Sequence, residues 1–551
     1  MKTFRLAFIL IIFSHSLAAQ LKFLVEDFEG LANGSSDLHL NGLFTYGFST
    51  ASVEEKVFPL KRTYSGQRAL KIERSGKQNY GGWGKGLTLN IALDPKEDHL
   101  NFYCFFPVTL PLIKATTIFS IEIREDDDNN SNFTTEHDDI WTYTLSVENT
   151  KKENDWQLIS IPLSKFKDTN PGGDGTFNVN YKQGKLFTIN FNFAPGNNFS
   201  DKQKCYFDFI CFSKGKLPSG PDLFSSPAAS ITDYANIGIF SMVDKTANFA
   251  DMGNIFASMF PTNAPKKLGV IHLFQPFGKD DGVKTSSYPS VERMNKIISE
   301  GYIPMITLEN HFIINDKNIK QPNLYSILDH HFDSFFGYWA SQIKQVKGTV
   351  LLRMLHEFNG DWYPWCLVNN DKDPKLLAKT FCYIRNIFTE NHVTNVKFIW
   401  CPNSMSIPQE SWNYIMDAYP GDDFVDYVGL DVYNGAGKSV AWTSFRKEGI
   451  ENYFLLTEQL PDKPLLICET ACRERWKNET LPSQNKAQWI EQMSDAIKTD
   501  MSKIRLVTWF NEKETFKINT SVEARDAYLK YILNDDHYRP VSGSVFITSH
   551  R

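Results

Sequence analysis

The sequence predicts an α/β protein in which a (β/α)8 barrel follows an all-β sandwich. From about residue 231 onward, eight short apolar runs alternate with longer helix-like segments. Residues 21 to about 213 instead hold many short strand-like runs between turn-rich stretches. A segment rich in proline, glycine and serine separates the two patterns. Such a segment is typical of a linker, so the 551 residues are expected to form two domains.

The first 20 residues have the features of a signal peptide. Lys2 and Arg5 precede an apolar run from Leu6 to Phe13, and small residues follow over 16–20. The apolar run is too short to span a bilayer, and no later stretch is long and apolar enough. We therefore expect an exported protein, periplasmic or extracellular, with no membrane span.

Residues 21–213 are expected to form the β-sandwich. Their apolar runs are short, and turn-rich stretches such as 171–175 interrupt them, a pattern typical of two packed antiparallel sheets. The expected strands are Phe23–Phe28, Ala69–Glu73, Gly86–Ile91, Asn101–Phe106, Thr117–Ile123, Trp141–Val147, Trp156–Ile161, Leu186–Phe193 and Tyr206–Phe212. Residues 214–230, with three prolines among glycine and serine, form the expected linker.

Residues 231–540 are expected to form the barrel. Their apolar runs are continuous rather than alternating, which indicates strands buried on both faces, as in a parallel sheet under helices. Eight such runs with helix-length crossovers predict a (β/α)8 barrel. The runs are Ile237–Phe240, Leu268–Leu273, Ile303–Leu308, Val350–Leu355, Val396–Trp400, Tyr427–Leu430, Leu465–Ile467 and Ile504–Trp509.

Two glutamates stand where a barrel carries its functional residues, at the carboxyl ends of strands. Glu357 follows the fourth expected strand and Glu469 follows the seventh. These strands lie on opposite sides of an eight-stranded ring, so their carboxyl groups are expected to converge across its mouth. A single glutamate at a strand end is more often a surface or loop-capping residue. The presence of two that face each other is what indicates a catalytic site.

Two facing carboxyl groups are what the hydrolysis of a glycosidic bond requires. One protonates the leaving oxygen, and at a separation of about 5–5.5 Å the other attacks the anomeric carbon with retention of configuration. We assign Glu357 as the acid/base and Glu469 as the nucleophile. Apolar walls from Trp362 and Trp365, together with the charge of Glu469, are expected to raise the pKa of Glu357.

Further rim residues are candidates for binding a sugar. Tyr433 is expected to donate its hydroxyl to Glu469, and Trp509 to form an apolar platform under the sugar at the cleavage site. For any single aromatic ring, core packing is the more ordinary role. The remaining candidates at or near strand ends are His356, Trp362, Trp365, Trp400, Asn403 and, on the second strand, His272.

The segment from Arg353 to Trp365 resembles glycoside hydrolase family 26. Residues 400–403, 426–434 and the strand that ends at Glu469 support the resemblance, which covers roughly residues 235–535. It implies Glu357 as acid/base, Glu469 as nucleophile, and His356, Trp362, Tyr433 and Trp509 around the sugar at the cleavage site. The family consists mainly of endo-β-1,4-mannanases, with minorities that cleave mixed-linkage β-glucan or β-1,3-xylan.

The sequence departs from the family pattern at three positions that line subsites. Phe358 stands where methionine is common, Phe510 where mannanases often carry arginine, and Gly435 where many relatives have tryptophan. We therefore expect a secreted retaining endo-β-glycanase with mannan as the first substrate. A mixed-linkage glucanase (lichenase) or β-1,3-xylanase is the alternative within the family, and a non-catalytic glycan-binding protein is the alternative of another class.

The remaining expectations concern partners and ions. A net charge of −6 gives no reason to expect nucleic acid, and no glycine-rich phosphate loop follows a strand, so no organic cofactor is expected. The partner is the polysaccharide substrate. The N-terminal domain is similar in pattern to β-sandwich carbohydrate-binding modules that open with a strand like Val25–Gly30. Asp27, Glu29 and Asp208 are the candidates there for a structural calcium ion.

Overall fold

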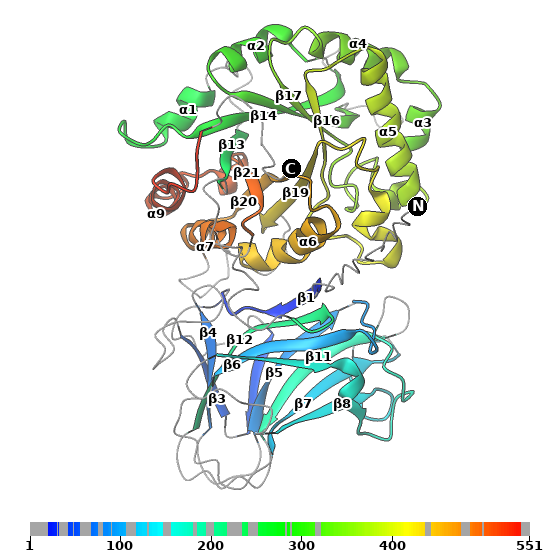
Figure 1. Ribbon diagram of the computed structural model, residues 1–551, viewed down its shortest axis with the longest axis vertical. Helices are drawn as coiled ribbons and strands as arrows, with labels where there is room; N and C mark the ends of the chain where they lie inside the picture. Colours follow the sequence, from blue (N-terminus) through cyan, green and yellow to red (C-terminus); the bar gives the residue numbers. More distant parts are fainter. Residues whose placement is uncertain are drawn as a thin grey trace, which may run out of the picture.

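The computed structural model contains a β-sandwich and a barrel, joined side by side (Figure 1). The structure describes residues 20–29, 31, 42–47, 49–54, 68–74, 81–89, 91–105, 117–128, 130, 132–146, 156–179, 184–193, 203–217, 234–240, 252–280, 284–286, 289–313, 321–435, 442–474, 485–498 and 501–540. Residues 1–19 of the expected signal peptide and most of the expected linker lie outside these residues, whereas Gln20 already begins strand β1. In the part of the chain that is described, no helix has the length and apolar character needed to cross a membrane.

Two six-stranded antiparallel sheets form the sandwich. One has the strand order β3-β4-β12-β6-β9 with β1 paired to β12, and the other has the order β10-β8-β7-β11-β5-β2. Aromatic side chains fill the space between them: Trp83 stacks on Phe191 with ring centroids 4.6 Å apart, and Phe207 packs against both. The strands are β1 Gln20–Glu26, β2 Leu43–Gly47, β3 Ser49–Glu54, β4 Ala69–Arg74, β5 Gly81–Leu89, β6 Asp98–Phe105, β7 Thr117–Asp126, β8 Ile140–Ser146, β9 Gln157–Pro162, β10 Lys167–Asp168, β11 Lys185–Phe193 and β12 Gln203–Lys214.

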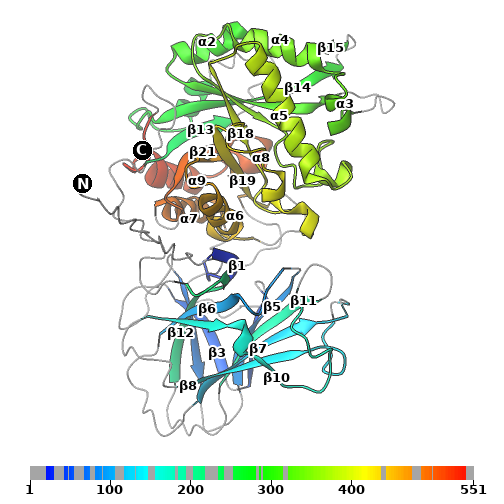
Figure 2. The ribbon, with the colours of Figure 1, turned by 45° about the vertical axis from the view of Figure 1, so that its right-hand side comes forward.

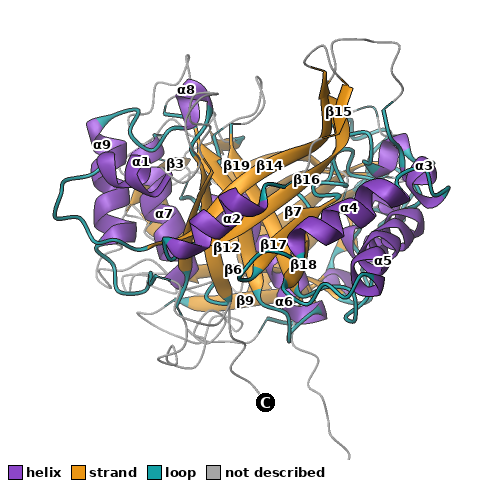
Figure 3. Ribbon diagram, turned by 90° about the horizontal axis from the view of Figure 1, so that it is seen from above, coloured by secondary structure: helices purple, strands orange, loops and turns teal. Residues whose placement is uncertain are grey.

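Eight parallel strands close into the barrel, as the sequence predicts. Their order is β13-β21-β20-β19-β18-β17-β16-β14, and a further pairing of β13 with β14 completes the ring. The short β15 extends β14 as an antiparallel hairpin that projects from the barrel (Figure 3). The strands are β13 Asn236–Phe240, β14 Leu268–Asp280, β15 Lys284–Ser286, β16 Ile303–Ile313, β17 Val350–Met354, β18 Val396–Trp400, β19 Tyr427–Asn434, β20 Leu465–Cys472 and β21 Ile504–Phe510.

The barrel strands are buried on both faces, which explains their continuous apolar sequences. One set of side chains fills the inside of the ring, among them Leu351, Ile399 and Leu466. The alternate set, such as Leu352 and Phe398, packs outward against the helices. The helices are α1 Met252–Ser258, α2 Val291–Ser299, α3 Leu324–Leu328, α4 Asp333–Ile343, α5 Pro374–Glu390, α6 Phe445–Gln459, α7 Lys486–Lys498, α8 Lys513–Phe516 and α9 Val522–Tyr528.

The sandwich docks on α6 through β1, the strand that lies at the junction of the two domains (Figure 2). Ile450 of α6 is fully buried in a cluster that is otherwise built from the sandwich, including Leu24 and Phe209. Hydrogen bonds also cross the interface: the Leu24 amide donates to Oε1 of Glu451 at 2.9 Å, and the Gln492 side chain donates to the Glu29 carbonyl at 2.8 Å. An apolar centre with satisfied polar neighbours is typical of a stable interface.

We predict that Ile450→Ala destabilises the protein by about 2–5 kcal/mol, because it removes a fully buried side chain from the interface cluster. Calorimetry of the whole chain measures the change, and Val522→Ala, at a position 59% exposed, is the control and is expected to stay within about 0.5 kcal/mol of wild type. A melting profile of Ile450→Ala that matches wild type would contradict the interface described here.

Candidate active site

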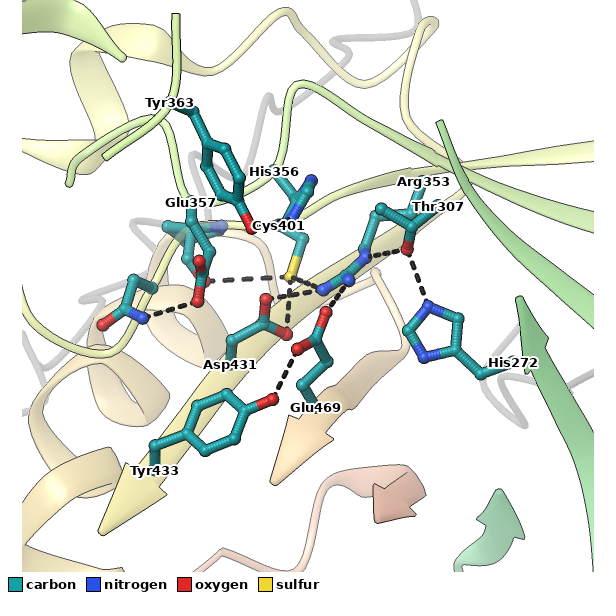
Figure 4. Close-up of polar contacts among 12 residues, drawn as sticks. His272, Thr307, Arg353, His356, Glu357, Tyr363, Cys401, Asp431, Tyr433 and Glu469 are labelled. Atoms are coloured by element: carbon teal, nitrogen blue, oxygen red, sulfur yellow. Dashed lines mark hydrogen bonds and ion pairs between the residues drawn. The ribbon is translucent and has the colours of Figure 1, made fainter. Parts of the chain in front are cut away.

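The two glutamates reach one opening of the barrel (Figure 4). Glu357 follows β17 and Glu469 lies within β20, and their exposed fractions are 7% and 6%. In the figure both carboxyl groups point toward the same space, with the guanidinium of Arg353 beside Glu469. The strand ends therefore bring together the two groups that the sequence singles out.

The backbone that presents Glu357 is strained. Leu355 and Glu357 have φ angles of +53° and +51°, a left-handed conformation that non-glycine residues rarely adopt and that tends to occur at functional sites. The Glu357 amide donates to the carbonyl of Cys401, 2.8 Å away on the segment after β18. This turn ends the strand abruptly and directs the Glu357 side chain over the mouth instead of along the sheet.

The Glu357 carboxyl group is held by two donors. The Asn403 side-chain amide donates to Oε1 at 2.7 Å, and the Trp362 indole donates to Oε2 at 2.8 Å. Burial, and secondly the charge of Glu469, raise the pKa of Glu357 to about 7. The pKa of Glu357 is thus raised, as expected. Trp362 was expected to help raise it, but its hydrogen bond lowers this pKa.

Glu469 accepts hydrogen bonds at both carboxyl oxygens. Oε1 accepts from Nη2 of Arg353, and Oε2 accepts from the Tyr433 hydroxyl at 2.5 Å. Burial raises the pKa of Tyr433 well above its ordinary value, so this phenol keeps the proton that it donates. The expected contact of Tyr433 with Glu469 is therefore present. Two donors, one at each oxygen, fix the orientation of this carboxyl group.

Arg353, to which the sequence analysis gave no role, organises the floor of the site. It is fully buried within β17, and its Nη1 donates to Oδ2 of Asp431 at 2.5 Å while its Nε donates to Thr307 at 2.7 Å. His272 lies 2.7 Å from the same threonine hydroxyl (Figure 4). Burial and the nearby guanidinium lower the pKa of His272 well below its usual value, so the ring is neutral. It contacts the network through Thr307.

His356 lies in the site wall. Its Nε2 is 3.2 Å from the Tyr363 hydroxyl, and its ring packs against both Tyr363 and Trp365. Trp365 is 1% exposed, stacks on Tyr363 at 4.3 Å and donates its indole hydrogen to the His356 carbonyl. Trp365 was expected to bind substrate, but the structure buries it behind Tyr363, where it supports the wall.

The expected platform at Trp509 is wrong. The indole is fully buried, packs edge-on against Trp489 and Tyr528 of the helical layer, and donates to the Phe516 carbonyl. Its neighbour Phe510 faces inward instead, next to Phe274 and Tyr433. Since successive strand residues point to opposite faces, a shift of one position decides which ring faces the inside of the barrel.

Trp400 also lies away from the mouth. It is 1% exposed and packs between Phe358 and Tyr419 on the outer side of the barrel wall. By contrast Trp362 is 42% exposed, and together with Asn403 it reaches Glu357. Of the expected binding residues, Trp362 and Asn403 thus contact Glu357, and Tyr433 contacts Glu469. His356 instead contacts Tyr363 in the wall.

Three groups of side chains have ligand atoms close enough to hold a metal ion, within the described residues. Cys401, Asp431 and Cys468 form one of them, but the guanidinium of Arg353 already pairs with Asp431 there. The two other groups are acidic side chains at the end of β7 and in the connection to β8: Glu125, Asp127 and Asp139, and Asp126, Asp128 and Asp138.

The calcium site expected at Asp27, Glu29 and Asp208 stays a prediction, since none of these groups contains them. Other partners take up oxygens of the first two: Oδ2 of Asp27 accepts from Ser444 of the barrel at 3.3 Å, and Oε1 of Glu29 accepts from the Arg68 amide at 2.6 Å. The segment that carries them therefore contributes to the domain junction.

Residues 303–499 match the family model described as Glycosyl hydrolase family 26. The barrel is similar to that family. The matched stretch contains both glutamates and five of the eight barrel strands, β16 to β20. The resemblance that the segment from Arg353 to Trp365 indicates is thereby confirmed for this part of the chain.

Curated relatives match part of the chain at moderate identity. Endoglucanase H of Acetivibrio thermocellus is 31% identical over 277 residues, which cover 48% of this chain and 28% of that protein. A mannan endo-1,4-beta-mannosidase of Bacillus subtilis is 34% identical over 98 residues, which cover 17% of this chain and 26% of the relative. The chain thus spans about a quarter of the length of these two relatives.

Among solved structures, a Podospora anserina GH26-CBM35 beta-(1,4)-mannanase is 12% identical and covers 90% of this chain and 97% of its own, with a TM-score of 0.41. The mannanase BoMan26A of Bacteroides ovatus is 16% identical and covers 57% and 95%, with a TM-score of 0.38. The barrel and the sandwich of this protein are established by its own strand pairing.

The raised pKa of Glu357 leads to a prediction about stability. The folded protein holds a proton on Glu357 up to about pH 7, whereas the unfolded chain releases it near the ordinary value of 4.5, so stability is lost as pH rises through this window. Glu357→Gln is therefore expected to be more stable than wild type at pH 8 and equally stable at pH 4, measured by urea unfolding. The exposed Glu390→Gln is the control, and a stability difference that does not change with pH would contradict the assignment.

Proposed function

We propose that the protein is a retaining endo-β-glycanase that hydrolyses the backbone of a β-linked plant-type polysaccharide. The observation that carries the proposal is the different environment of the two carboxyl groups. Glu357 has a pKa of about 7 and can hold a proton, whereas Glu469 accepts from Arg353 and Tyr433 at both oxygens. A proton donor beside a fixed carboxylate is the pair that glycoside hydrolysis uses.

In the first step Glu469 attacks the anomeric carbon while Glu357 transfers its proton to the departing glycosidic oxygen. A covalent glycosyl–enzyme bond to Glu469 forms as the bond to the leaving sugar breaks. Asn403 and Trp362 orient Glu357 through its two oxygens, and Tyr433 holds the oxygen of Glu469 that it contacts. Phe274 and Phe510, which pack edge-on against each other, form an aromatic wall beside the centre.

In the second step Glu357, now ionised, takes a proton from water, and the water oxygen attacks the same carbon. The bond to Glu469 breaks, and both carboxyl groups return to their starting protonation states. Two inversions restore the original configuration. A pKa near 7 suits this double role, because the group must give a proton and later accept one.

The substrate that we propose first is β-1,4-mannan. Several relatives carry the name mannan endo-1,4-beta-mannosidase, two of them from Bacillus subtilis. The same proposal includes export through the N-terminal segment, since a polysaccharide substrate lies outside the cell. It also includes glycan binding by the sandwich.

A β-glucan is the second candidate substrate. The relative with the longer alignment, over 48% of this chain, carries the name Endoglucanase H. Phe510 and Gly435 also depart from the pattern that mannanases often have at positions lining subsites. Release of reducing ends from mannan, mixed-linkage glucan and β-1,3-xylan separates these substrates. Retardation in affinity gels without any release would favour a non-catalytic glycan-binding protein.

We predict that Glu357→Ala and Glu469→Ala differ in their response to the leaving group. Both variants are expected to lose about 10²–10⁴-fold or more in kcat on the polysaccharide. On an aryl glycoside whose phenol departs without a proton, Glu357→Ala is expected to keep most of the first step, seen as a burst of phenol, while Glu469→Ala shows none. Glu390→Gln serves as the control, and near-full polysaccharide hydrolysis by either alanine variant would contradict the proposal.

A further inference from the structure

A cavity of about 470 Å³ lies where the sandwich meets the barrel. Phe23 of β1 and Ala92 line it from the sandwich, while the loop after β18 and helix α6 line it from the barrel. Its volume falls within the range of small-molecule sites, which occur preferentially at domain interfaces. Neither domain alone encloses it.

The cavity is connected to the catalytic centre by a short piece of chain. Asn403 binds Glu357, and Ser404 and Ser406, one and three residues further on, line the cavity. Three residues span at most about 11 Å. Two side-chain amides fix the loop on this path: Asn359 donates to the Ser406 hydroxyl at 3.2 Å, and Asn452 of α6 donates to the Ser404 carbonyl at 2.7 Å.

Exposed apolar side chains also occur in the loops that carry Glu357 and line the cavity. Trp362, Met405, Ile407 and Tyr414 are 42%, 37%, 39% and 44% exposed, and they account for four of the seven large apolar residues that are exposed among the described residues. All four belong to the connections after β17 and β18. Aromatic and aliphatic side chains exposed in these two connections are suited to contact the apolar faces of a sugar chain that runs from the centre to the cavity.

The lining has the composition of a carbohydrate site. Tyr414 and Phe23 supply ring faces for the apolar side of a sugar, and Gln409 and Glu410 supply an amide and a carboxylate for its hydroxyl groups. Asn413 does not serve this purpose directly, since its amide already donates to the carbonyls of Asn359 and Pro408. It holds the loop in shape.

We propose that this cavity is a distal subsite that binds the leaving-group half of the polysaccharide chain, with the sandwich forming one of its walls. The proposal rests on the function proposed above and deepens it. We assign it to the leaving-group half because Asn403 binds Glu357, the group proposed to protonate the leaving oxygen, and the loop runs on from Asn403 to the cavity. The sandwich then acts on the same chain that the barrel cuts.

The test compares kcat/KM for a short aryl glycoside and for a series of manno- and gluco-oligosaccharides of increasing length. Tyr414→Ala removes a ring from the barrel side, and Ala92→Trp fills the cavity from the sandwich side. Tyr338→Ala, at an exposed position on α4, is the control. Both cavity variants are expected to lose about tenfold on long chains and nothing on the aryl glycoside, with unchanged melting temperatures.

Cavity variants that act equally on short and long substrates, or on neither, would overturn the subsite while the proposed activity stands. If wild type hydrolyses none of the substrates, the proposed function fails instead. The subsite is then tested by calorimetric binding of the longest oligosaccharides. Loss of affinity in both cavity variants but not in Tyr338→Ala would support it, and unchanged affinity would overturn it.

Discussion

The buried ion pairs of Arg353 with Asp431 and Glu469 are the constraint on which the rest of the site depends. A guanidinium without exposure inside a barrel is tolerated only when its donors are satisfied, and removing one partner of such a pair typically costs about 3–5 kcal/mol. Here β16, β17, β19 and β20 each contribute a group to the network, with Thr307 as the fourth member. The position of Glu469 is therefore fixed by four strands of the barrel and does not depend on a loop.

Under the proposed function, this arrangement also gives the two carboxyl groups different tasks. Glu469 lies against the cation, whereas Glu357 sits on a strained turn above it and has amide and indole donors only. Burial and the charge of Glu469 then favour the neutral form of Glu357. Two residues of the same type can therefore act as acid and as nucleophile when their surroundings differ. The sandwich is connected to this arrangement, because the loop that orients Glu357 through Asn403 continues into the domain junction.

The sequence predicts the barrel well, because continuous apolar runs at helix-length spacing have few alternative explanations, and all eight runs are strands in the structure. It also predicts that the two glutamates lie at strand ends, since strand ends are easy to locate, whereas their catalytic roles stay a prediction. It fails where one residue of register decides the outcome: Trp509 points to the helices and Phe510 to the mouth. The role of Arg353 was also missed, although a single arginine within an apolar strand signals a buried partner. Its partners come from distant strands, and only the closed ring brings them together.

The most direct test of the account is to trap the covalent intermediate. A glycoside with a good leaving group and a fluorine beside the anomeric carbon slows the second step, so that the sugar stays attached to the residue that attacked it. Mass spectrometry of the digested protein is expected to find the sugar on the peptide that contains Glu469, and to find none in Glu469→Gln. A sugar attached to Glu357 instead, or rapid turnover to a product of inverted configuration with no adduct, would contradict the account.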